Sequence, residues 1–441
     1  MKKLNEILEE KMLPIAAKLG SNKVLMAIRD GVTLSMPLII IGSLFLVISS
    51  FPIDAWKTWL TDVGIKAYLS KGVDSSFGLM GLIASFGIAN SLARQHKVDG
   101  ISAGVIALSS FVVVTPFLTS DAGAGIPVAY MGSKGLFMAM IIAIFSALIF
   151  KWFIQHNIQI KLPEAVPPAV SRSFSALIPG AAIITLWLVL FAVLDKIGVT
   201  NIHALLGKIL GGPLSLLTNN IFGILVSILL NSLFWFVGIH GGNVVNSMIS
   251  PLWLINSDAN RLIFQADKFA ELPNIITKEF MDNFVYMGGG GATLGLVIVI
   301  TIIARSKKSS KLSKAMAPLT LTPGLFNINE PAIFGIPIVM NISFLIPFIL
   351  APMANAIISY VAMATGLVAK TVGIAVSWTM PPIISGFLTT GGKISGAVLQ
   401  LVCILVDVII YWFFYKTVEK QNLVLEAEEM EADEINTSLM S

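Results

Sequence analysis

The sequence predicts an all-α polytopic membrane protein with about ten transmembrane helices, two re-entrant hairpins and amphipathic surface helices. Of its 441 residues, 56% are hydrophobic and only 12% are charged, whereas a soluble domain is about 25% charged. The mean hydropathy is +0.85. The net charge of +4 does not indicate nucleic-acid binding, because Lys and Arg in membrane proteins mainly mark the cytoplasmic loops.

The N-terminal segment, residues 3–18, carries apolar side chains on one helical face and Lys or Glu on the other. This pattern predicts an interfacial helix that contacts membrane lipid, and a soluble packing helix is an equally good interpretation. The chain does not open on a charged-then-apolar signal pattern, so we expect insertion to use the transmembrane helices themselves.

Five apolar spans follow, and residues 1–195 form an N-terminal membrane half. The spans are expected near residues 31–51, 75–93, 99–119, 135–153 and 174–194. An amphipathic linker, 196–217, then carries Lys196, His203 and Lys208 along the membrane surface between two halves.

The second half, residues 218–422, is expected to bind and transport the substrate. Its spans are predicted near 218–238, 243–256, 287–304, 338–368 and 394–414, with a polar segment near 257–284. Proline and glycine break the chain at about 315–337 and 378–392, which predicts two re-entrant hairpins that enter from opposite faces. Two interrupted segments in one half point to a binding site at the membrane midplane. The acidic tail, 423–441, is expected to be cytoplasmic, solvated and partly disordered.

Basic residues predict the sidedness of the spans. The densest basic cluster, at 305–314, is cytoplasmic by the positive-inside rule. If the N-terminus is inside, the second, fourth, eighth and tenth spans all end at basic stretches. Ten spans with both termini cytoplasmic therefore satisfy the rule.

Glu330 is the only Asp, Glu, Lys or Arg between Lys314 and Lys370. A carboxylate this isolated in apolar sequence is costly unless it has a function or a partner. Pro331 lacks an N–H and biases Glu330 away from helical dihedral angles. We therefore expect Glu330 on interrupted backbone at membrane depth, where such backbone lines a wet cavity or is buried in protein. Asn327 and Asn329 either bind the ligand beside it or satisfy freed backbone groups.

His240 is the only readily ionisable side chain between Ile209 and Asn256. Its neighbour Gly241 allows close approach of the backbone to a ligand, and Asn243 lies nearby, so a ligand contact competes with a satisfied core histidine.

Trp378 precedes two prolines and either stacks on a sugar ring or anchors the chain at the membrane interface. Thr389 and Thr390 either offer hydroxyl groups to the substrate or cap the second hairpin. Asp407 lies in the last span, and the sequence does not assign it a role.

The sequence lacks recognisable motifs for ATP hydrolysis, metal binding and dinucleotide binding. Walker A and HExxH motifs are absent, and the only glycine run, Gly288–Gly291, opens a membrane span without matching a dinucleotide fingerprint. The single cysteine, Cys403, lies in an apolar stretch, which excludes a disulfide within the chain and a cysteine metal site. We expect neither a cofactor nor a metal ion.

Two motifs resemble those of a known family. The stretch Gly-Ile-His-Gly-Gly-Asn at 238–243, followed by Phe-Asn-Ile-Asn-Glu-Pro-Ala-Ile-Phe-Gly-Ile-Pro at 326–337, is similar to the membrane IIC component of bacterial phosphotransferase-system sugar transporters. The lactose, cellobiose and diacetylchitobiose type is the nearest match. The resemblance covers essentially the whole chain, and the Asn-Glu-Pro motif with its flanks is its specific part.

The resemblance implies a homodimeric permease in the bacterial inner membrane, with the first five spans at the dimer interface. Glu330 would engage the C6 hydroxyl of a disaccharide, His240 would lie near the same group, and Trp378 would stack on the sugar. A separate cytoplasmic IIB protein would donate phosphate from a phosphocysteine, so whether this chain itself counts as an enzyme stays open. The alternative is an ion-coupled secondary transporter in which Glu330 carries a proton.

Overall fold

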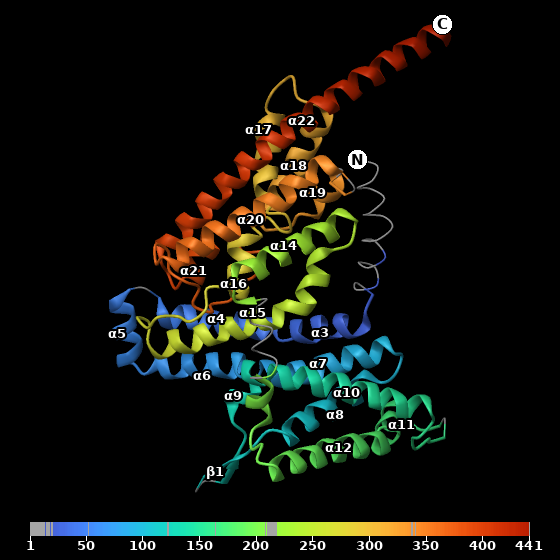
Figure 1. The fold of residues 1–441 in the computed structure, drawn as a ribbon, viewed down its shortest axis with the longest axis vertical. Helices are drawn as coiled ribbons and strands as arrows, with labels where there is room; N and C mark the ends of the chain where they lie inside the picture. The colour runs from blue at the N-terminus through green and yellow to red at the C-terminus, as the bar shows by residue number, and fades with distance from the viewer. Residues whose placement is uncertain are drawn as a thin grey trace. The chain divides into compact units, whose positions relative to one another are not determined.

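A computed structural model describes residues 14, 18, 21–51, 53–120, 123–163, 165–207, 209, 218–336, 338–339 and 341–440. Within these ranges the regular secondary structure is helical except for one small hairpin, which the sequence did not predict (Figure 1). Its antiparallel strands are β1 (Leu118–Ser120) and β2 (Gly123–Gly125), with Leu118 opposite Gly125. The predicted all-α class is confirmed.

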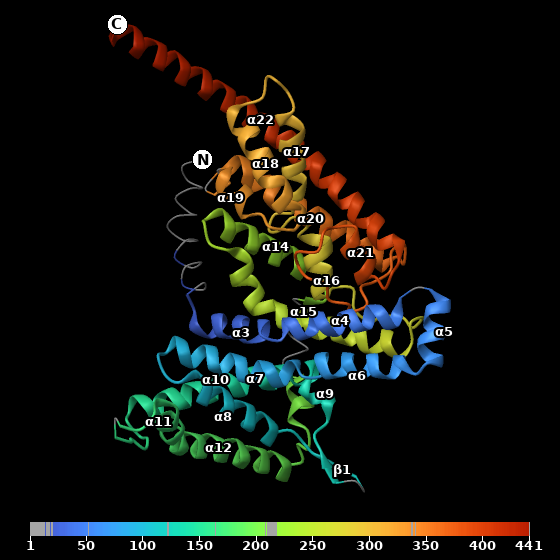
Figure 2. The same ribbon diagram turned by 180° about the vertical axis from the view of Figure 1, so that it is seen from behind.

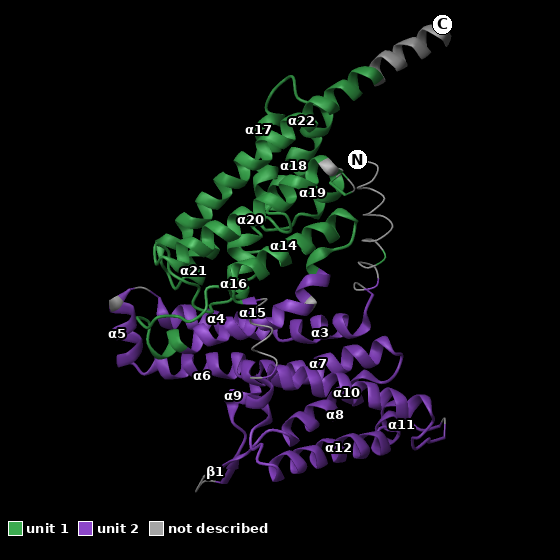
Figure 3. Ribbon diagram, viewed as in Figure 1, with its two compact units in different colours: residues 1–16, 219–242, 263–441 green, residues 17–218, 243–262 purple. Residues whose placement is uncertain are grey.

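The chain divides into two compact units, coloured separately in Figure 3. Unit 2 comprises Ala17–Thr218 and Asn243–Leu262, and unit 1 comprises Met1–Ala16, Asn219–Gly242 and Ile263–Ser441. One helix, α15 (Gly241–Ala266), contributes residues to both units. The sequence places residues 243–262 in the second half of the protein, whereas here they group with the first.

Unit 2 is built around α7, which packs against α3, α8 and α10. A glycine on each side allows α3 and α7 to approach closely, because a Cβ atom at Gly31 would lie 2.2 Å from the backbone nitrogen of Ile88. The helices of this unit are α3 (Lys23–Thr33), α4 (Met36–Ser50), α5 (Asp54–Asp62), α6 (Ile65–Phe77), α7 (Met80–Gln95), α8 (Gly100–Val113), α9 (Val128–Met131), η2 (Ser133–Gly135), α10 (Leu136–Gln155), α11 (Pro168–Ser175) and α12 (Leu177–Lys196).

Unit 1 is built around the long helix α22, which packs against α17, α20 and α21 (Figure 2). Its core gathers Trp235, Phe344, Phe348, Tyr411 and Tyr415 with aliphatic side chains of α17 and α18. The helices of this unit are α14 (Ile221–Phe236), α16 (Lys278–Phe280), the π-helix η3 (Met281–Val285), α17 (Leu294–Ala304), α18 (Lys311–Leu325), α19 (Glu330–Gly335), α20 (Ile342–Ala364), α21 (Ile384–Thr389) and α22 (Ile394–Met440).

Six helical stretches among the described residues are long and apolar enough to cross a membrane, as a multi-pass protein requires. They are Lys23–Ser50, Ile65–Gln95, Ser133–Gln155, Pro168–Lys196, Ser343–Ala364 and Ile394–Glu428. Shorter apolar helices occupy Gly100–Val113, Ile221–Phe236 and Leu294–Ala304. The count of ten spans stays a prediction, and the predicted N-terminal surface helix lies almost entirely outside the described residues.

Two helices run further than expected. Helix α15 continues to Ala266, through the start of the predicted polar segment. Its polar residues do not end it, because Asp258 and Arg261 lie one turn apart and pair with each other. Helix α22 continues to Met440, where we expected partial disorder. Residues 423–440 contain neither glycine nor proline, and Glu, Ala, Leu and Met favour helix.

The predicted linker is described at its N-terminal end, up to residue 207, and at residue 209. There, His203 is 3% exposed, and its Nε2 lies 3.0 Å from Oγ1 of Thr115. Its ring stacks on Tyr130 with centroids 4.9 Å apart. Burial lowers the pKa of His203 to about 4, so the neutral ring ties the linker to unit 2.

Candidate functional site

Residues 288–291 form a glycine loop between η3 and α17 in unit 1. Gly288, Gly289 and Gly291 have φ angles of 81°, 94° and 80°, which favour glycine because other residues pay a steric cost there. The sequence suggested that this run opens a membrane span. Instead the helix begins only at Leu294, because three left-handed residues cannot continue an α-helix.

All four carbonyl groups of the glycine loop accept hydrogen bonds. The acceptors at Gly288 and Gly289 are satisfied within the loop region, by Thr293 Oγ1 at 2.6 Å and by the N–H of Ala292 at 3.0 Å. Gly290 accepts from Asn329 Nδ2 at 2.8 Å, and Gly291 accepts from the hydroxyl of Tyr411 at 2.7 Å. The loop is therefore fixed by side chains from two other elements, since buried backbone groups need partners.

The turn between α18 and α19 is fixed by Asn327, which is 8% exposed. Its φ of 61° is one that Asn tolerates better than most residues. Its Oδ1 accepts from the N–H of Gly288 at 2.7 Å, and its Nδ2 donates to the carbonyls of Trp378 at 2.7 Å and Met380 at 3.1 Å. One amide thus joins the turn, the glycine loop and the second interrupted segment.

Glu330 is the first residue of the short helix α19, and Pro331 follows in its first turn. The expectation that Pro331 would keep Glu330 out of a helix is wrong, since proline is tolerated in the first helical turn. The backbone around Glu330 is nevertheless interrupted, as predicted, because α18 ends at Leu325. The Glu330 side chain is exposed, and among the described residues it forms no ion pair or hydrogen bond.

His240 lies just after α14 and is exposed. Its ring packs on Trp235, with centroids 4.3 Å apart and planes inclined by 46°. Trp235 is 5% exposed and also borders the glycine loop, because a Cβ atom at Gly290 would lie 2.7 Å from its Nε1. Trp235, which packs on His240, and Asn329, which precedes Glu330 in the chain, therefore both contact the glycine loop.

Gly241 and Asn243 follow His240 in α15. A Cβ atom at Gly241 would lie 2.1 Å from the carbonyl oxygen of Asn231, so packing alone requires a glycine there. Asn231, which the sequence places among the asparagines around His240, is buried, and its Oδ1 has no hydrogen-bond partner in the described structure. Asn243 is exposed and falls in unit 2, so its part in the site stays a prediction.

The second interrupted segment supplies the remaining candidates. Trp378 is 57% exposed, and its carbonyl is held by Asn327. Thr389 and Thr390 are buried, and their hydroxyls donate to the carbonyls of Ser385 and Gly386 at 2.8 and 2.7 Å. The structure thus presents the indole of Trp378 openly, whereas both threonine hydroxyls already have acceptors in α21.

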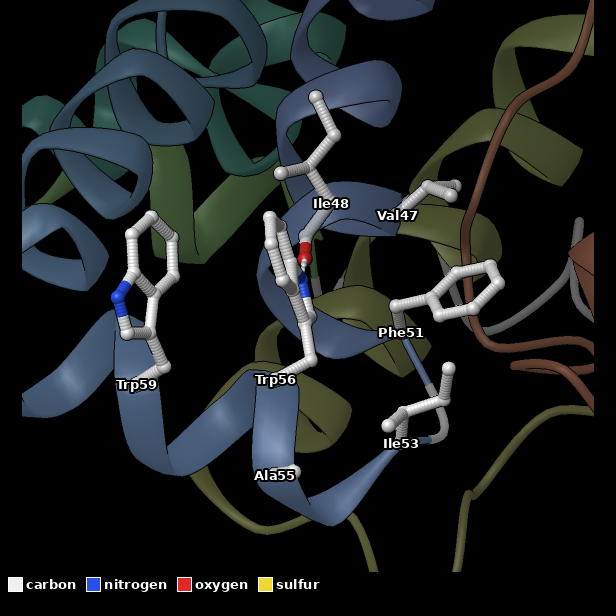
Figure 4. A pocket seen from close by; sticks show the side chains of 7 residues that line it. All are labelled: Val47, Ile48, Phe51, Ile53, Ala55, Trp56 and Trp59. Carbon is white, nitrogen blue, oxygen red and sulfur yellow. Dashed lines mark hydrogen bonds between the residues drawn. The ribbon is translucent and has the colours of Figure 1, made fainter.

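A cavity of about 690 Å³ in unit 2 contains none of these residues. Figure 4 shows the rings of Trp56 and Trp59 beside it, stacked with centroids 5.2 Å apart. Its lining consists of Val47, Ile48, Phe51, Ile53, Ala55, Trp56 and Trp59. An apolar lining has few groups that orient a sugar hydroxyl.

The sequence did not single out the glycine loop as part of the site, although four consecutive glycines were a visible signal. Metal binding gains no support from the described part of the chain, where no three His, Cys, Asp or Glu side chains are placed to hold an ion. The site is therefore built from one carboxylate, one imidazole, aromatic rings and amides. Such groups hydrogen-bond and stack on polar organic ligands.

Comparisons with known proteins identify the family of this chain. The family model described as "Phosphotransferase system, EIIC" matches residues 29–352. The lichenan permease IIC component of Bacillus subtilis (strain 168) is 46% identical, over 96% of this chain and 95% of its own. The cellobiose-specific EIIC component of Geobacillus stearothermophilus is 45% identical, over 98% and 97%.

A solved structure matches over nearly the whole chain as well. The crystal structure of the transporter ChbC, the IIC component from the N,N'-diacetylchitobiose-specific phosphotransferase system, aligns with a TM-score of 0.89 and 42% identity. The alignment covers 96% of this chain and 99% of that one. These matches confirm the family that the Asn-Glu-Pro motif indicated, and the chain belongs to the phosphotransferase-system EIIC family of sugar permeases.

Proposed function

We propose that this EIIC protein carries a β-linked disaccharide of the cellobiose or diacetylchitobiose type across the bacterial inner membrane. It presents the C6 hydroxyl of the sugar to a separate IIB protein that bears a phosphocysteine. The names of its relatives, which specify lichenan, cellobiose and N,N'-diacetylchitobiose, support this substrate class.

The observation that carries the proposal is the open carboxylate of Glu330 on a braced turn. The side chains of Asn327 and Asn329 form hydrogen bonds with the glycine loop and with the second interrupted segment. Their role in this proposal is to position Glu330, and Glu330 itself is left to meet the ligand. His240, whose ring packs on Trp235, supplies a second polar group, and Trp235 borders the same loop.

Phosphoryl transfer depends on alignment and charge stabilisation more than on covalent help from the protein. In the proposed step, the C6 oxygen attacks phosphorus, a P–O bond forms and the S–P bond to the cysteine of IIB breaks. Glu330 accepts the hydroxyl proton, and the cysteine leaves as a thiolate. His240 donates a hydrogen bond to the C6 oxygen or to a phosphate oxygen. Trp378 stacks on the sugar ring.

The phosphocysteine is assigned to another protein because the only cysteine here is unsuited to the role. Cys403 is 0% exposed in α22, and its Sγ lies 3.6 Å from the hydroxyl of Ser359.

We also propose a homodimer with its interface in residues 1–195, a substrate-binding half in residues 218–422, and cytoplasmic termini. In this scheme Thr389 and Thr390 stabilise the second hairpin, since their hydroxyls donate to carbonyls of α21.

The test uses purified protein in lipid vesicles with labelled sugars. Cellobiose, diacetylchitobiose and lactose are compared, with phosphorylated IIB supplied on one side. We expect sugar 6-phosphate to form only with phosphorylated IIB, and β-linked glucosides or chitobiose to be preferred. A IIB variant with its cysteine replaced by serine is the matched control. Uptake of unmodified sugar that collapses with an uncoupler would instead favour the ion-coupled alternative, which has no support from the family comparisons.

A further inference from the structure

One face of α22 is a stripe of buried polar side chains. Gln400, Asp407, Tyr411 and Tyr415 are 0% exposed, and Glu419 is 7% exposed. Spacings of seven and four residues place them on a single helical face. The stripe supplies hydrogen-bond partners to α21, to the glycine loop and to the start of α18.

The members of the stripe other than Asp407 have well-placed partners. The amide of Gln400 accepts from the N–H of Gly386 and donates to the carbonyl of Asn283 at 2.7 Å and to Ser385. The hydroxyl of Tyr411 binds the glycine loop. At the other end, Glu419 accepts from the N–H of Ser310 at 2.6 Å and so caps α18.

Asp407 is different. Its Oδ2 accepts from Asn355 Nδ2 of α20 at 2.9 Å, whereas its Oδ1 is buried without a hydrogen-bond partner in the described structure. The Oδ1 of Asn355 is also buried and has no such partner. No Lys, Arg or His of the described chain pairs with this carboxyl group. Two side chains that touch through one hydrogen bond thus each leave an oxygen unsatisfied.

An ionised carboxylate with a single neutral donor is expensive to bury, and such a group takes up a proton instead. A hydrated cation has no room on the α17 side, because a Cβ atom at Gly295 would lie only 2.5 Å from Cβ of Asp407. A neutral carboxylic acid and a primary amide are complementary, since each places one donor beside one acceptor, and the second N–H of Asn355 donates to the carbonyl of Val285 at 3.4 Å. One proton therefore satisfies both unpaired oxygens.

We propose that Asp407 holds a proton from bulk water and forms a two-hydrogen-bond acid–amide pair with Asn355. The pair joins α20 to α22 one turn before Tyr411, which holds the glycine loop. Asp407 is thus a positioning residue that keeps its proton, and it carries no charge during transport. The assignment is independent of which sugar is carried.

The titratable neighbours give Asp407 no opposite charge. The titratable side chains one turn away on α22 are Cys403 and Tyr411, and the packed elements α20 and η3 contribute Tyr360 and Asp282. Asp282 is already paired with Lys278, and α17 contains no titratable side chain. No cation on the neighbouring elements is therefore placed to hold Asp407 in its ionised form.

Infrared spectroscopy of the intact protein in lipid tests the proposal. Protonated carboxylic acids absorb in a region free of ionised carboxylates and backbone amides. We expect one such band in the wild-type protein at neutral pH, which moves on isotope labelling of the aspartate side chains. It should vanish in Asp407→Asn and shift in Asn355→Leu, which keeps the acid but removes the amide. Absence of the band in the wild-type protein would overturn the assignment even if both variants failed to fold.

Substitution gives an independent readout. Asn at 407 reproduces the acceptor and donor of a neutral acid, so Asp407→Asn should keep the thermal midpoint and the sugar phosphorylation rate within about twofold. Asp407→Leu removes both groups and should lower the midpoint by several degrees. If Asp407→Asn is as damaging as Asp407→Leu, the carboxylate charge is required and the proposal is wrong.

Discussion

Asp258 in unit 2 and Glu330 in unit 1 are two acids with opposite surroundings. In unit 2, Asp258 is 5% exposed and pairs with Arg261 at 2.7 Å, and it also accepts a hydrogen bond from Ser133. The guanidinium of Arg261 lies 4.5 Å from the ring centre of Phe77. In unit 1, Glu330 is exposed and has no partner among the residues described.

The difference separates a structural acid from one available to a ligand. A buried charge is tolerated when its hydrogen-bonding capacity is met by the protein, as it is for Asp258. Asn327 and Asn329 instead form hydrogen bonds with main-chain groups. These bonds fix the turn, and the carboxylate of Glu330 has no partner among the described residues. An acid whose neighbours are all satisfied without it is the better candidate for binding and chemistry.

The largest effect is expected at Glu330. Glu330→Gln keeps the shape but removes the proton acceptor, and we expect the rate of sugar phosphorylation to fall roughly a thousandfold. The thermal midpoint should hardly change, because no described partner is lost. Glu428→Gln, which alters an exposed acid of α22, is the matched control. An unchanged phosphorylation rate in folded Glu330→Gln protein would refute its assigned role.

Arg261→Met should show the opposite profile. Removing the guanidinium leaves Asp258 charged and buried, and we expect a loss of about 3 kcal/mol in the free energy of unfolding. The folded fraction should still bind sugar with normal affinity. The double variant Arg261→Met, Asp258→Asn should recover much of the stability, because it removes the unpaired charge. Chemical denaturation in detergent measures both variants, and failure of the double variant to recover would show that Arg261 acts through other contacts.

Asn327→Ala tests the bracing of the Glu330 turn. It removes three hydrogen bonds to main-chain groups and places alanine at a φ of 61°, so we expect to lose about 2 kcal/mol of stability. Sugar affinity should fall as well, because the turn is less ordered. Asn329→Ala, which removes one bond, should cost about 1 kcal/mol. Equal effects of the two substitutions would argue against Asn327 as the central brace.

The smallest effect is expected at Trp378. Trp378→Ala should weaken sugar binding several-fold, or about 1 kcal/mol, by removing a stacking surface, and Trp378→Phe should retain part of the affinity. The exposed Trp59 of unit 2 provides a control, since Trp59→Ala should leave affinity unchanged. Calorimetric titration with the preferred disaccharide measures all three, and wild-type affinity in Trp378→Ala would reduce that tryptophan to an interfacial anchor.

The membrane class and the broken Asn-Glu-Pro turn could be predicted because each depends on local properties. Apolar length and the positions of proline and glycine are visible in the chain itself. The family also followed from this motif, because its flanks are specific. The partners of Asn327 could not be predicted, since Gly288 and Trp378 are distant in sequence and meet only through tertiary packing.

Other outcomes depended on which of two local effects prevailed. Proline at the second position of α19 permits a helical start at Glu330, although it disfavours helix for the residue before it in other contexts. Polar residues in α15 looked like a loop because their pairing within unit 2 was not visible. The glycine loop was taken for the start of a span because apolar sequence follows it directly.

The crowding at Gly289 and Gly290 has a consequence for changing the sugar preference of this permease. A Cβ atom at Gly289 would lie 2.6 Å from Cγ of Asn329, and one at Gly290 would meet Trp235. Neither position can vary without displacing the groups that support Glu330 or His240. A library aimed at new disaccharides should therefore keep Gly289 and Gly290 and vary exposed residues instead, beginning with Trp378.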